Sequence, residues 1–242
     1  MQESELWLTK LFNDYLAVPG NWFLRLVGLP YHARPWADFI VMQLLVVAIL
    51  VLLVLVLRGR LSVDRPGKLQ HVFELNYEFV HGQTEDQMGH DGEKYLGYFA
   101  TIFLFILFCN LIGLIPGFEA PTMNPVVPLG CAAATFLYYN MVGIQANGAK
   151  YAAHFVGPFW WLAPLMIPIE IVSHLARPLS LTIRLFANMY AGEKVTTVFL
   201  SLTYFVIPAV FMGLHLFVAL MQAYIFMLLS MIYVAGASAH EH

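Results

Sequence analysis

Five polar or charged side chains recur on one side of a long apolar segment near the end of this 242-residue chain. They are a carboxylate, an imidazole, two guanidiniums and a carboxamide: Glu170, His174, Arg177, Arg184 and Asn188. On a helix they fall within about 80° of arc and extend over roughly 27 Å, close to the thickness of a bilayer's hydrocarbon core. The spacing therefore predicts one membrane helix with a single charged and polar face.

Charged side chains within a membrane segment are costly, must face protein or water, and mark a function by default. Arg184 is the hardest of them to explain as packing, because it lies near mid-membrane, cannot lose its proton, and has no acid three or four residues away. Arg177 could instead snorkel to the cytoplasmic interface. Glu170 could simply pair with Arg177.

The last apolar segment has a sparser polar face. His215, Gln222 and Tyr233 fall within about 20° of one direction on a helix. If the two segments form an antiparallel hairpin, His215 lies near Glu193 and Gln222 lies level with Arg184. A buried His215 could also serve only as a hydrogen bond between helices.

Composition places these segments in a membrane protein. The chain is 60% apolar and 11% charged, with a mean hydropathy of +0.71 and a net charge of -3. Soluble domains are about 45–50% apolar and about 25% charged. These values exclude disorder, a nucleic-acid binder and a disulfide-stapled secreted module, and they argue against a soluble enzyme.

We predict an all-α integral membrane protein with about five transmembrane helices plus interfacial amphipathic helices. The predicted spans are 39–57, 95–115, 126–146, 160–200 and 206–235. The last two form a long tilted hairpin whose turn Pro208 marks. Residues 36–240 are predicted to be a single membrane domain, and residues 1–35 an N-terminal interfacial segment.

The one extended hydrophilic stretch, 58–94, has five basic residues and apolar residues at helical spacing, which predicts a surface helix. Basic residues occur there and at Lys150, whereas 116–125 has none. Because Lys and Arg are enriched in cytoplasmic loops, the N-terminus is predicted outside and the C-terminus in the cytoplasm. Solvent exposure rather than metal binding is expected for three histidines of the hydrophilic loop: His71, His81 and His90.

The segment Arg177-Pro-Leu-Ser-Leu-Thr-Ile-Arg-Leu-Phe-Ala-Asn-Met-Tyr-Ala-Gly-Glu193 resembles the subunit a family of the F-type ATP synthase, the stator of its membrane sector. The runs 108–117 and 221–228 resemble the family's second full span and final helix, and the resemblance covers residues 36–240. It implies a non-catalytic proton-translocating subunit without cofactor or metal, with the ATP chemistry on other subunits.

The same resemblance implies the partners and the location. The partners are a rotating ring of c subunits, the peripheral-stalk b subunits and the rest of the F1Fo complex, in a lipid membrane that is expected to be the bacterial inner (plasma) membrane. Two offset half-channels meet the c-ring, and Arg184 is the essential arginine between them.

Further site residues follow from the resemblance position by position. Glu193, His215 and Gln222 match positions that line the outer half-channel. Three residues match positions near the inner path or the ring contact: Glu170, Ser180 and Asn188. His174 and Arg177 belong to the same expected proton path and ring interface.

The outer entrance departs from the family pattern. Some members have an acidic residue where this chain has Gly113. Asn110, with Asn124 and Glu119, is therefore expected to serve that entrance.

Two other functions fit part of the pattern. An intramembrane haem-binding electron-transfer protein could use His174 and His215 as axial ligands, but it does not require a mid-membrane Arg184. A secondary transporter usually has inverted repeats, and none is visible in the sequence.

Overall fold

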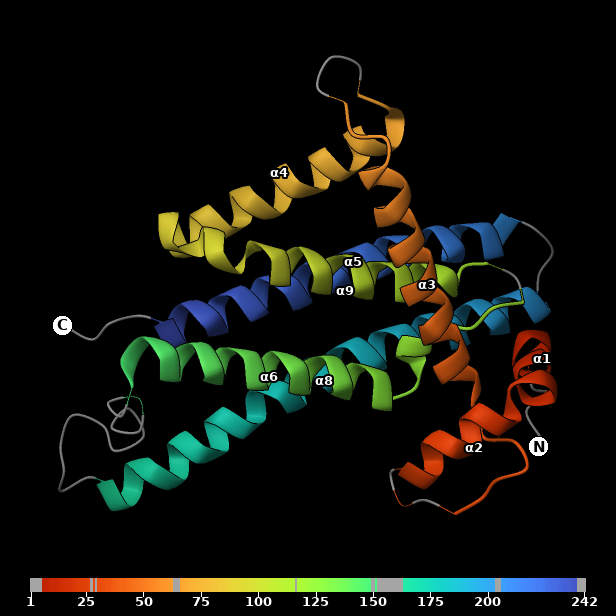
Figure 1. Cartoon of the computed structure of the whole chain (residues 1–242), viewed down its shortest axis with the longest axis horizontal. Helices are drawn as coiled ribbons and strands as arrows, with labels where there is room; N and C mark the ends of the chain where they lie inside the picture. Colours follow the sequence, from red (N-terminus) through yellow and green to blue (C-terminus); the bar gives the residue numbers. More distant parts are fainter. Residues whose placement is uncertain are drawn as a thin grey trace.

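The computed structural model of the chain describes residues 6–238 apart from 27, 29, 63–65, 116, 149–150, 152–162 and 203–205. The described part contains helices and no strand (Figure 1). Its elements in chain order are α1 (Trp7–Tyr15), α2 (Ala17–Leu26), α3 (Asp38–Arg58), α4 (Lys68–Met88), η1 (Gly89–Tyr95), α5 (Leu96–Ile112), η2 (Pro121–Met123), α6 (Val126–Asn147), α8 (Ala163–Leu202) and α9 (Val206–Ser238).

Apolar composition determines which helices belong in a membrane. Four described helical segments are long and apolar enough to cross one: Asp38–Arg58, Asp91–Ile112, Val126–Asn147 and Ala209–Ser238. Helix α8 is longer still but carries five charged residues, and it fills the predicted 160–200 span except for 160–162, which lie outside the described residues. The chain is an all-α membrane protein, as predicted. Where the membrane surfaces cut these helices stays a prediction.

Helices α8 and α9 are too long to stand upright in a bilayer. They have 40 and 33 residues, hence lengths of roughly 60 Å and 50 Å against a hydrocarbon core of about 30 Å. Figure 1 shows both running along the bundle beside α5 and α6, whereas α3 crosses the bundle steeply. Excess helix length is accommodated by tilt, which agrees with the predicted tilted hairpin.

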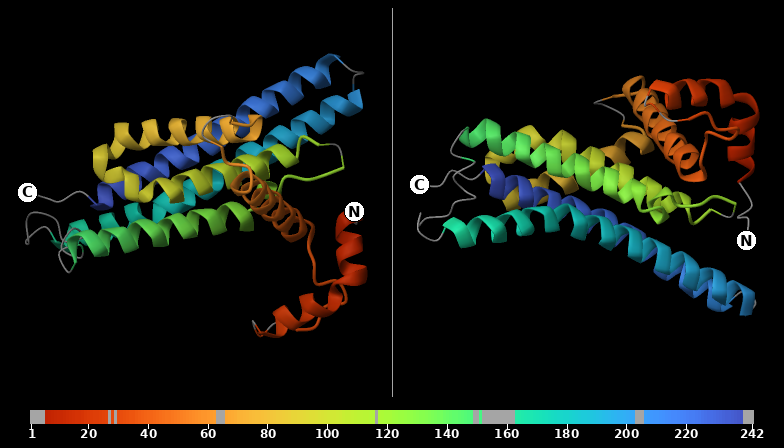
Figure 2. Two further views of the ribbon diagram at one scale, coloured as in Figure 1. Left: turned by 45° about the horizontal axis from the view of Figure 1, so that its top comes forward. Right: turned by 90° about the horizontal axis from the view of Figure 1, so that it is seen from below.

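Helix α8 bends part-way along its length (Figure 2). Pro178 lies inside the helix, so its missing N–H leaves the carbonyl of His174 without the usual helical donor. One turn later the Thr182 hydroxyl donates to the Pro178 carbonyl at 2.8 Å, a back-bond that also bends helices. Both devices lie within two turns of Arg184, so they help set the direction of the segment that carries it.

The bounds of α8 and α9 agree with the two predicted hairpin helices, 160–200 and 206–235: α8 ends at Leu202 and α9 begins at Val206. The turn itself, at 203–205, lies outside the described residues. Pro208, which was expected to mark the turn, lies in the first turn of α9. A proline is tolerated there because the first N–H groups of a helix have no helical acceptor.

The helix predicted within the 58–94 loop is present as α4 and is docked on the bundle, while its place on the membrane surface stays a prediction. The Phe79 ring lies 5.8 Å from the Phe103 ring of α5 and 5.7 Å from the Tyr224 ring of α9. The Tyr224 hydroxyl donates to Gln83 Oε1 at 2.9 Å. Helix α4 is thereby tied to the two helices that form the centre of the bundle.

The substitution Tyr224→Phe is expected to loosen α4 while leaving the ring contact in place. Loss of one neutral hydrogen bond costs about 0.5–1.5 kcal/mol, so amide exchange in 68–88 is expected to rise by up to about tenfold where it proceeds by local opening. Hydrogen exchange measured by mass spectrometry tests this. Tyr190→Phe is the control, since the Tyr190 hydroxyl has no hydrogen bond within the described residues. Equal protection of α4 in both variants would contradict the docking role.

Candidate functional site

Two contacts define the register of the α8–α9 hairpin. At one end, a Cβ added to Gly192 would lie 3.2 Å from Cδ2 of His215, so the two helices touch there. At the other end, the Arg177 guanidinium lies over the Tyr233 ring, 5.4 Å from its centroid. The predicted antiparallel pairing, with His215 beside the position preceding Glu193, is therefore present.

Arg184 lies midway between these two contacts along α8, which brings it level with about residue 224 of α9, within one helical turn of Gln222. Its side chain is half-buried. Within the described part of the chain it makes neither an ion pair nor a hydrogen bond. A guanidinium that cannot lose its proton is thus left without a partner among the described residues of its own chain.

The predicted polar stripe of α8 divides between two surroundings. His174 is buried against α6, with 8% of its surface exposed, whereas Ser180 and Asn188 are exposed. Arg177 and Arg184 lie at the border and are half-buried. One edge of the stripe therefore belongs to the bundle, and the other faces away from the described chain.

A group of polar side chains, here called the α6 cluster, joins α6 to the first half of α8. Its members are Tyr139, Asn140, Tyr151, His174 and Arg177. His174 Nε2 lies 3.3 Å from the Tyr139 hydroxyl and 3.0 Å from Asn140 Oδ1, and the Tyr151 hydroxyl donates to the same Oδ1 at 3.0 Å. The buried imidazole is therefore connected to two hydroxyl groups through short contacts.

Arg177 is held in the α6 cluster by aromatic rings. Its guanidinium lies 6.0 Å from the centroid of Tyr139 and 5.4 Å from that of Tyr233, contacts worth about 0.5–2 kcal/mol each depending on desolvation. Arg177 and Glu170 form no ion pair in the described part of the chain, so the simple pairing considered from the sequence is wrong. Glu170 is half-buried and close enough to Tyr151 to interact electrostatically.

A second group, here called the η2 cluster, lies toward the hairpin turn. Its members are Asn110, Glu119, Thr122, Glu193, His215 and Gln222. Asn110 is fully buried; its Nδ2 donates to the Ala219 carbonyl at 3.1 Å and its Oδ1 accepts from the Thr122 hydroxyl at 2.8 Å. Ala219 lies one helical turn from both polar residues of α9 in this cluster, so Asn110 is adjacent to the polar face of α9.

His215 has an unusual environment. Only 3% of its surface is exposed, and its Nε2 has no hydrogen-bond partner within the described residues. Buried polar atoms without a partner are rare and call for an explanation. The alternative considered from the sequence was that His215 serves only as a hydrogen bond between helices. His215 makes no such bond within the described residues.

Glu193 and Glu119 approach each other from different elements. Glu193 is half-buried on α8, and the carboxylates of the two residues lie close enough to interact electrostatically. Asn124, expected at the same entrance, accepts a hydrogen bond from the Val126 N–H through its Oδ1 at 3.1 Å, one residue before Pro125, the N-cap of α6. Glu119 is the loop acid whose charge acts on Glu193, and the η2 element that follows it packs on α8.

Gly113 is a position where a side chain does not fit. A Cβ there would lie 2.7 Å from Cβ and 3.0 Å from N of Ala120, which is almost completely buried. The loop between α5 and α6 thus occupies the space that an acidic residue at position 113 would need. The same loop brings Glu119, the residue before Ala120, into the site.

Some members of the two clusters were missed by the sequence analysis. Tyr139 and Tyr151 carry no charge and stand among many other aromatic residues, while Thr122 lies in a short loop without a motif. The adjacent polar pair at 139–140, inside an otherwise apolar span, was the available signal.

The haem alternative does not fit this geometry. His174 belongs to the α6 cluster, whereas His215 packs on Gly192, 18 residues further along α8. That separation is roughly 27 Å along the helix, so the two imidazoles cannot be axial ligands of one iron.

Comparison with known proteins gives one consistent result. The profile of the family described as ATP synthase A chain matches residues 40–235. The ATP synthase subunit a of Solibacter usitatus is 69% identical over 233 residues, which is 96% of this chain and 100% of that protein. Proteins of the same name from Koribacter versatilis and Geobacter sulfurreducens are 49% and 41% identical, over 98% and 91% of this chain and 98% and 96% of their own lengths.

The close approach of Gly192 to His215 predicts a size limit. Gly192→Val is expected to lower the free energy of unfolding by about 1–3 kcal/mol, because the added methyl groups must push against the buried imidazole. Unfolding of the purified protein in mixed detergent–SDS micelles measures this. Gly213→Val is the matched control on the facing helix, since nothing lies within 4 Å of a Cβ there. If both variants lose the same stability, the contact is not limiting.

Proposed function

The chain belongs to the ATP synthase subunit a family, and from this premise we propose that it is the proton-translocating stator of the membrane sector. Two offset half-paths would end at different heights on the c-ring, separated by the Arg184 guanidinium. The subunit itself performs no ATP chemistry, which takes place on other subunits of the complex. Residues 36–240 form the membrane domain that does this work.

The observation that carries the proposal is the uncovered face of α8 around Arg184. Exposed neighbours on this side are polar or small: Ser180, Ala187, Asn188 and Ala191. A face with a fixed charge cannot remain against lipid, and small residues allow a partner helix to approach closely. A ring of helices with one carboxylate each at mid-membrane depth satisfies both conditions.

The role of the fixed cation follows from electrostatics. A guanidinium opposite a ring carboxylate favours its ionised form, so that carboxylate releases its proton before it passes Arg184. It must be protonated again before it rotates into lipid, where a bare charge is too costly. The same cation blocks a direct leak of protons between the two half-paths, as an arginine in a pore does.

The two clusters lie where the half-paths are needed. The η2 cluster, with Glu193, His215 and Gln222, serves proton uptake from the outer side, with Glu119 and Asn110 nearer its mouth. The α6 cluster, with His174 and Glu170, serves release on the inner side, and Ser180 and Asn188 contact the ring. Each proton that crosses gains about 2.3 kcal/mol per 100 mV of membrane potential.

Topology and partners complete the proposal. The basic 58–94 loop lies in the cytoplasm, so the N-terminus is outside and the C-terminus is inside. The membrane is the bacterial inner membrane, because the relatives named above are bacterial proteins. Besides the c-ring, the peripheral-stalk b subunits hold the chain still while the ring turns.

Replacement of the fixed cation tests the central claim. Arg184→Ala is expected to abolish coupled ATP synthesis and to permit a passive proton leak, because nothing then separates the half-paths. ATP synthesis and proton conductance of membrane vesicles measure the two effects. Lys194→Ala, an exposed cation on the same helix, is the control and should leave both near wild type. Normal ATP synthesis in Arg184→Ala would refute the assignment.

Two further variants test the outer half-path. Glu193→Gln and His215→Leu are each expected to slow proton movement several-fold, because neither side chain can then bind and release a proton. ATP-driven proton pumping by inverted vesicles, normalised to assembled complex, is the measurement. Glu85→Gln on α4 is the control, being an exposed carboxylate outside both clusters. Unchanged pumping would remove the altered residue from the path.

A further inference from the structure

The N-terminal helices α1 and α2 are fastened to the start of α3 by two buried asparagines. Asn13 Nδ2 donates to the Trp36 carbonyl at 3.1 Å, and Asn13 Oδ1 accepts from the Trp36 N–H at 3.0 Å. Asn21 makes the same pair of bonds with the backbone of His32, at 2.9 Å and 3.0 Å. Each asparagine amide thus pairs with both the N–H and the carbonyl of one backbone residue, as a neighbouring β-strand would. These bonds hold α1 and α2 in a defined position against the linker that leads into α3.

Helix α1 also reaches the loop between α5 and α6. The Trp7 ring meets the Phe118 ring edge-on, with centroids 6.4 Å apart and an interplanar angle of 74°. Phe118 packs at the same time against a buried cluster from α3 and α5 that contains Met42 and Cys109. Three elements therefore contact Phe118, which is half-buried, and α1 provides one of these contacts.

Phe118 and Ala120 are the chain neighbours of Glu119, and both are held. Ala120 packs on Gly113 with 2% of its surface exposed, while Phe118 is held as described. The backbone between them carries Glu119 just before Ala120 and η2, and η2 packs on α8, the helix of Glu193; the charge of Glu119 acts on Glu193 across this contact. The place of Glu119 therefore follows from how Phe118 and Ala120 are held, and Trp7 supplies one of the contacts on Phe118.

We propose that α1 and α2 form a brace that keeps Glu119 beside Glu193 at the mouth of the outer half-path. Trp7 is then a positioning residue for proton uptake, acting through Phe118. This inference rests on the proposed function, since it assigns Glu119 to that path. The matched family profile begins at residue 40, so the brace lies wholly outside the region that the profile covers.

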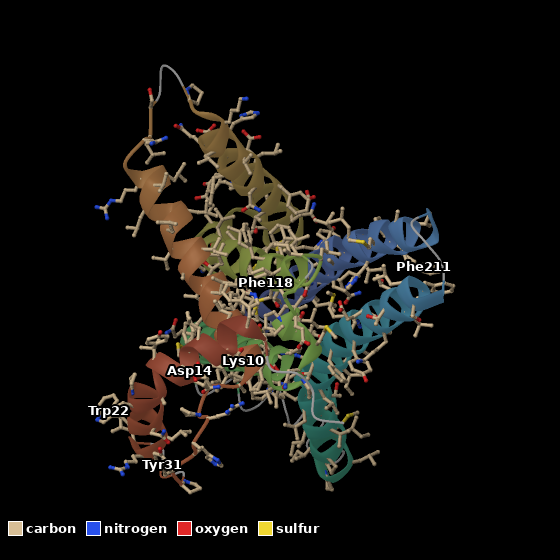
Figure 3. The ribbon with its side chains drawn as sticks, turned by 90° about the vertical axis from the view of Figure 1, so that its right-hand side faces the viewer. Lys10, Asp14, Trp22, Tyr31, Phe118 and Phe211 are labelled. Atoms are coloured by element: carbon tan, nitrogen blue, oxygen red, sulfur yellow. The ribbon has the colours of Figure 1, made fainter. Side chains whose placement is uncertain are left out.

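The outward side of the brace suits a lipid interface. Trp22 and Tyr31 are 65% and 69% exposed, and Figure 3 shows both at the part of the N-terminal segment that lies away from the bundle. Trp and Tyr are enriched at membrane–water interfaces. A segment that rests on lipid at one end and on Phe118 at the other holds the loop at a fixed depth.

Kinetics of the assembled complex test the brace. Trp7→Ala is expected to lower ATP synthesis driven by an imposed proton gradient several-fold per assembled complex, whereas Trp7→Phe, which keeps an aromatic edge, should preserve the rate. Tyr15→Ala is the control, because Tyr15 is on the same helix and 79% exposed. A wild-type rate in Trp7→Ala, or an equal loss in Tyr15→Ala, overturns the proposal.

A double variant separates positioning from general damage to the fold. In a Glu119→Gln background, Trp7→Ala is expected to cause no further loss, because both changes act on the same carboxylate. The same fold-loss in both backgrounds, or a wild-type rate in Glu119→Gln alone, overturns the brace. Neither outcome alters the requirement for Arg184, which the Arg184→Ala measurement addresses separately, so the two proposals can fail independently.

Crosslinking reports the contact itself in the complex. Trp7→Cys combined with Phe118→Cys should form a disulfide on mild oxidation, whereas Tyr15→Cys combined with Phe118→Cys should not. Absence of the first crosslink in an assembled complex, or equal yields of both, would show that α1 does not hold this loop.

Discussion

A charge that cannot be neutralised, fixed inside a membrane helix, constrains the rest of this structure. Arg184 is half-buried and has no ion pair or hydrogen bond from the described part of its own chain. At the mid-membrane depth proposed for Arg184 the bilayer would offer it no solvation, so the proposed function requires another protein to cover the helix face around it. That need explains why one side of α8 is polar and small rather than bulky and apolar, unlike the exposed side of α3, where Leu52 and Leu55 suit lipid.

The length of the hairpin lets the single charge of Arg184 separate two groups of polar residues. Because α8 and α9 are far longer than the hydrocarbon core is thick, they lie tilted in the membrane and place the α6 cluster and the η2 cluster at opposite ends of a long contact. Arg184 stands between the two clusters. In the proposed function, a partner that moves past the hairpin would therefore meet one cluster, then the cation, then the other.

Much of this arrangement could be predicted from the sequence, because it depends on periodicity and charge. The helices follow from apolar runs, and the facing of Gly192 and His215 follows from an antiparallel hairpin. Helical periodicity does not say which arc of a stripe a neighbouring helix covers, so the burial of His174 and the exposure of Asn188 could not be separated. Neutral partners such as Tyr139 gave no signal, since an aromatic residue in an apolar span is ordinary.

The N-terminal segment shows a different limit of sequence reasoning. Asn13 and Asn21 lie in amphipathic stretches, where asparagine is expected on the wet face, yet both are buried with 7% of their surface exposed. Their side chains bond to the backbone of Trp36 and His32, residues that lie more than ten positions later in the sequence. The pairing therefore depends on the linker before α3 folding back onto α1 and α2. No local pattern encodes such a contact.

Gly113 and Glu119 suggest how two different sequence positions could supply a carboxylate to the same region of the fold. The space beside Gly113 is filled by Ala120, whose Cβ would lie 2.7 Å from any Cβ at position 113. An acid on α5 would have to displace that buried methyl group, whereas an acid one residue before Ala120 reaches the same region without doing so. An alignment to the family would show no acid at position 113, although Glu119 of the loop carries an acid close to that position. In the proposed function, the outer mouth is therefore shaped by how tightly this loop closes over α5, and the packing around Phe118 matters to the proton path although no proton passes through it.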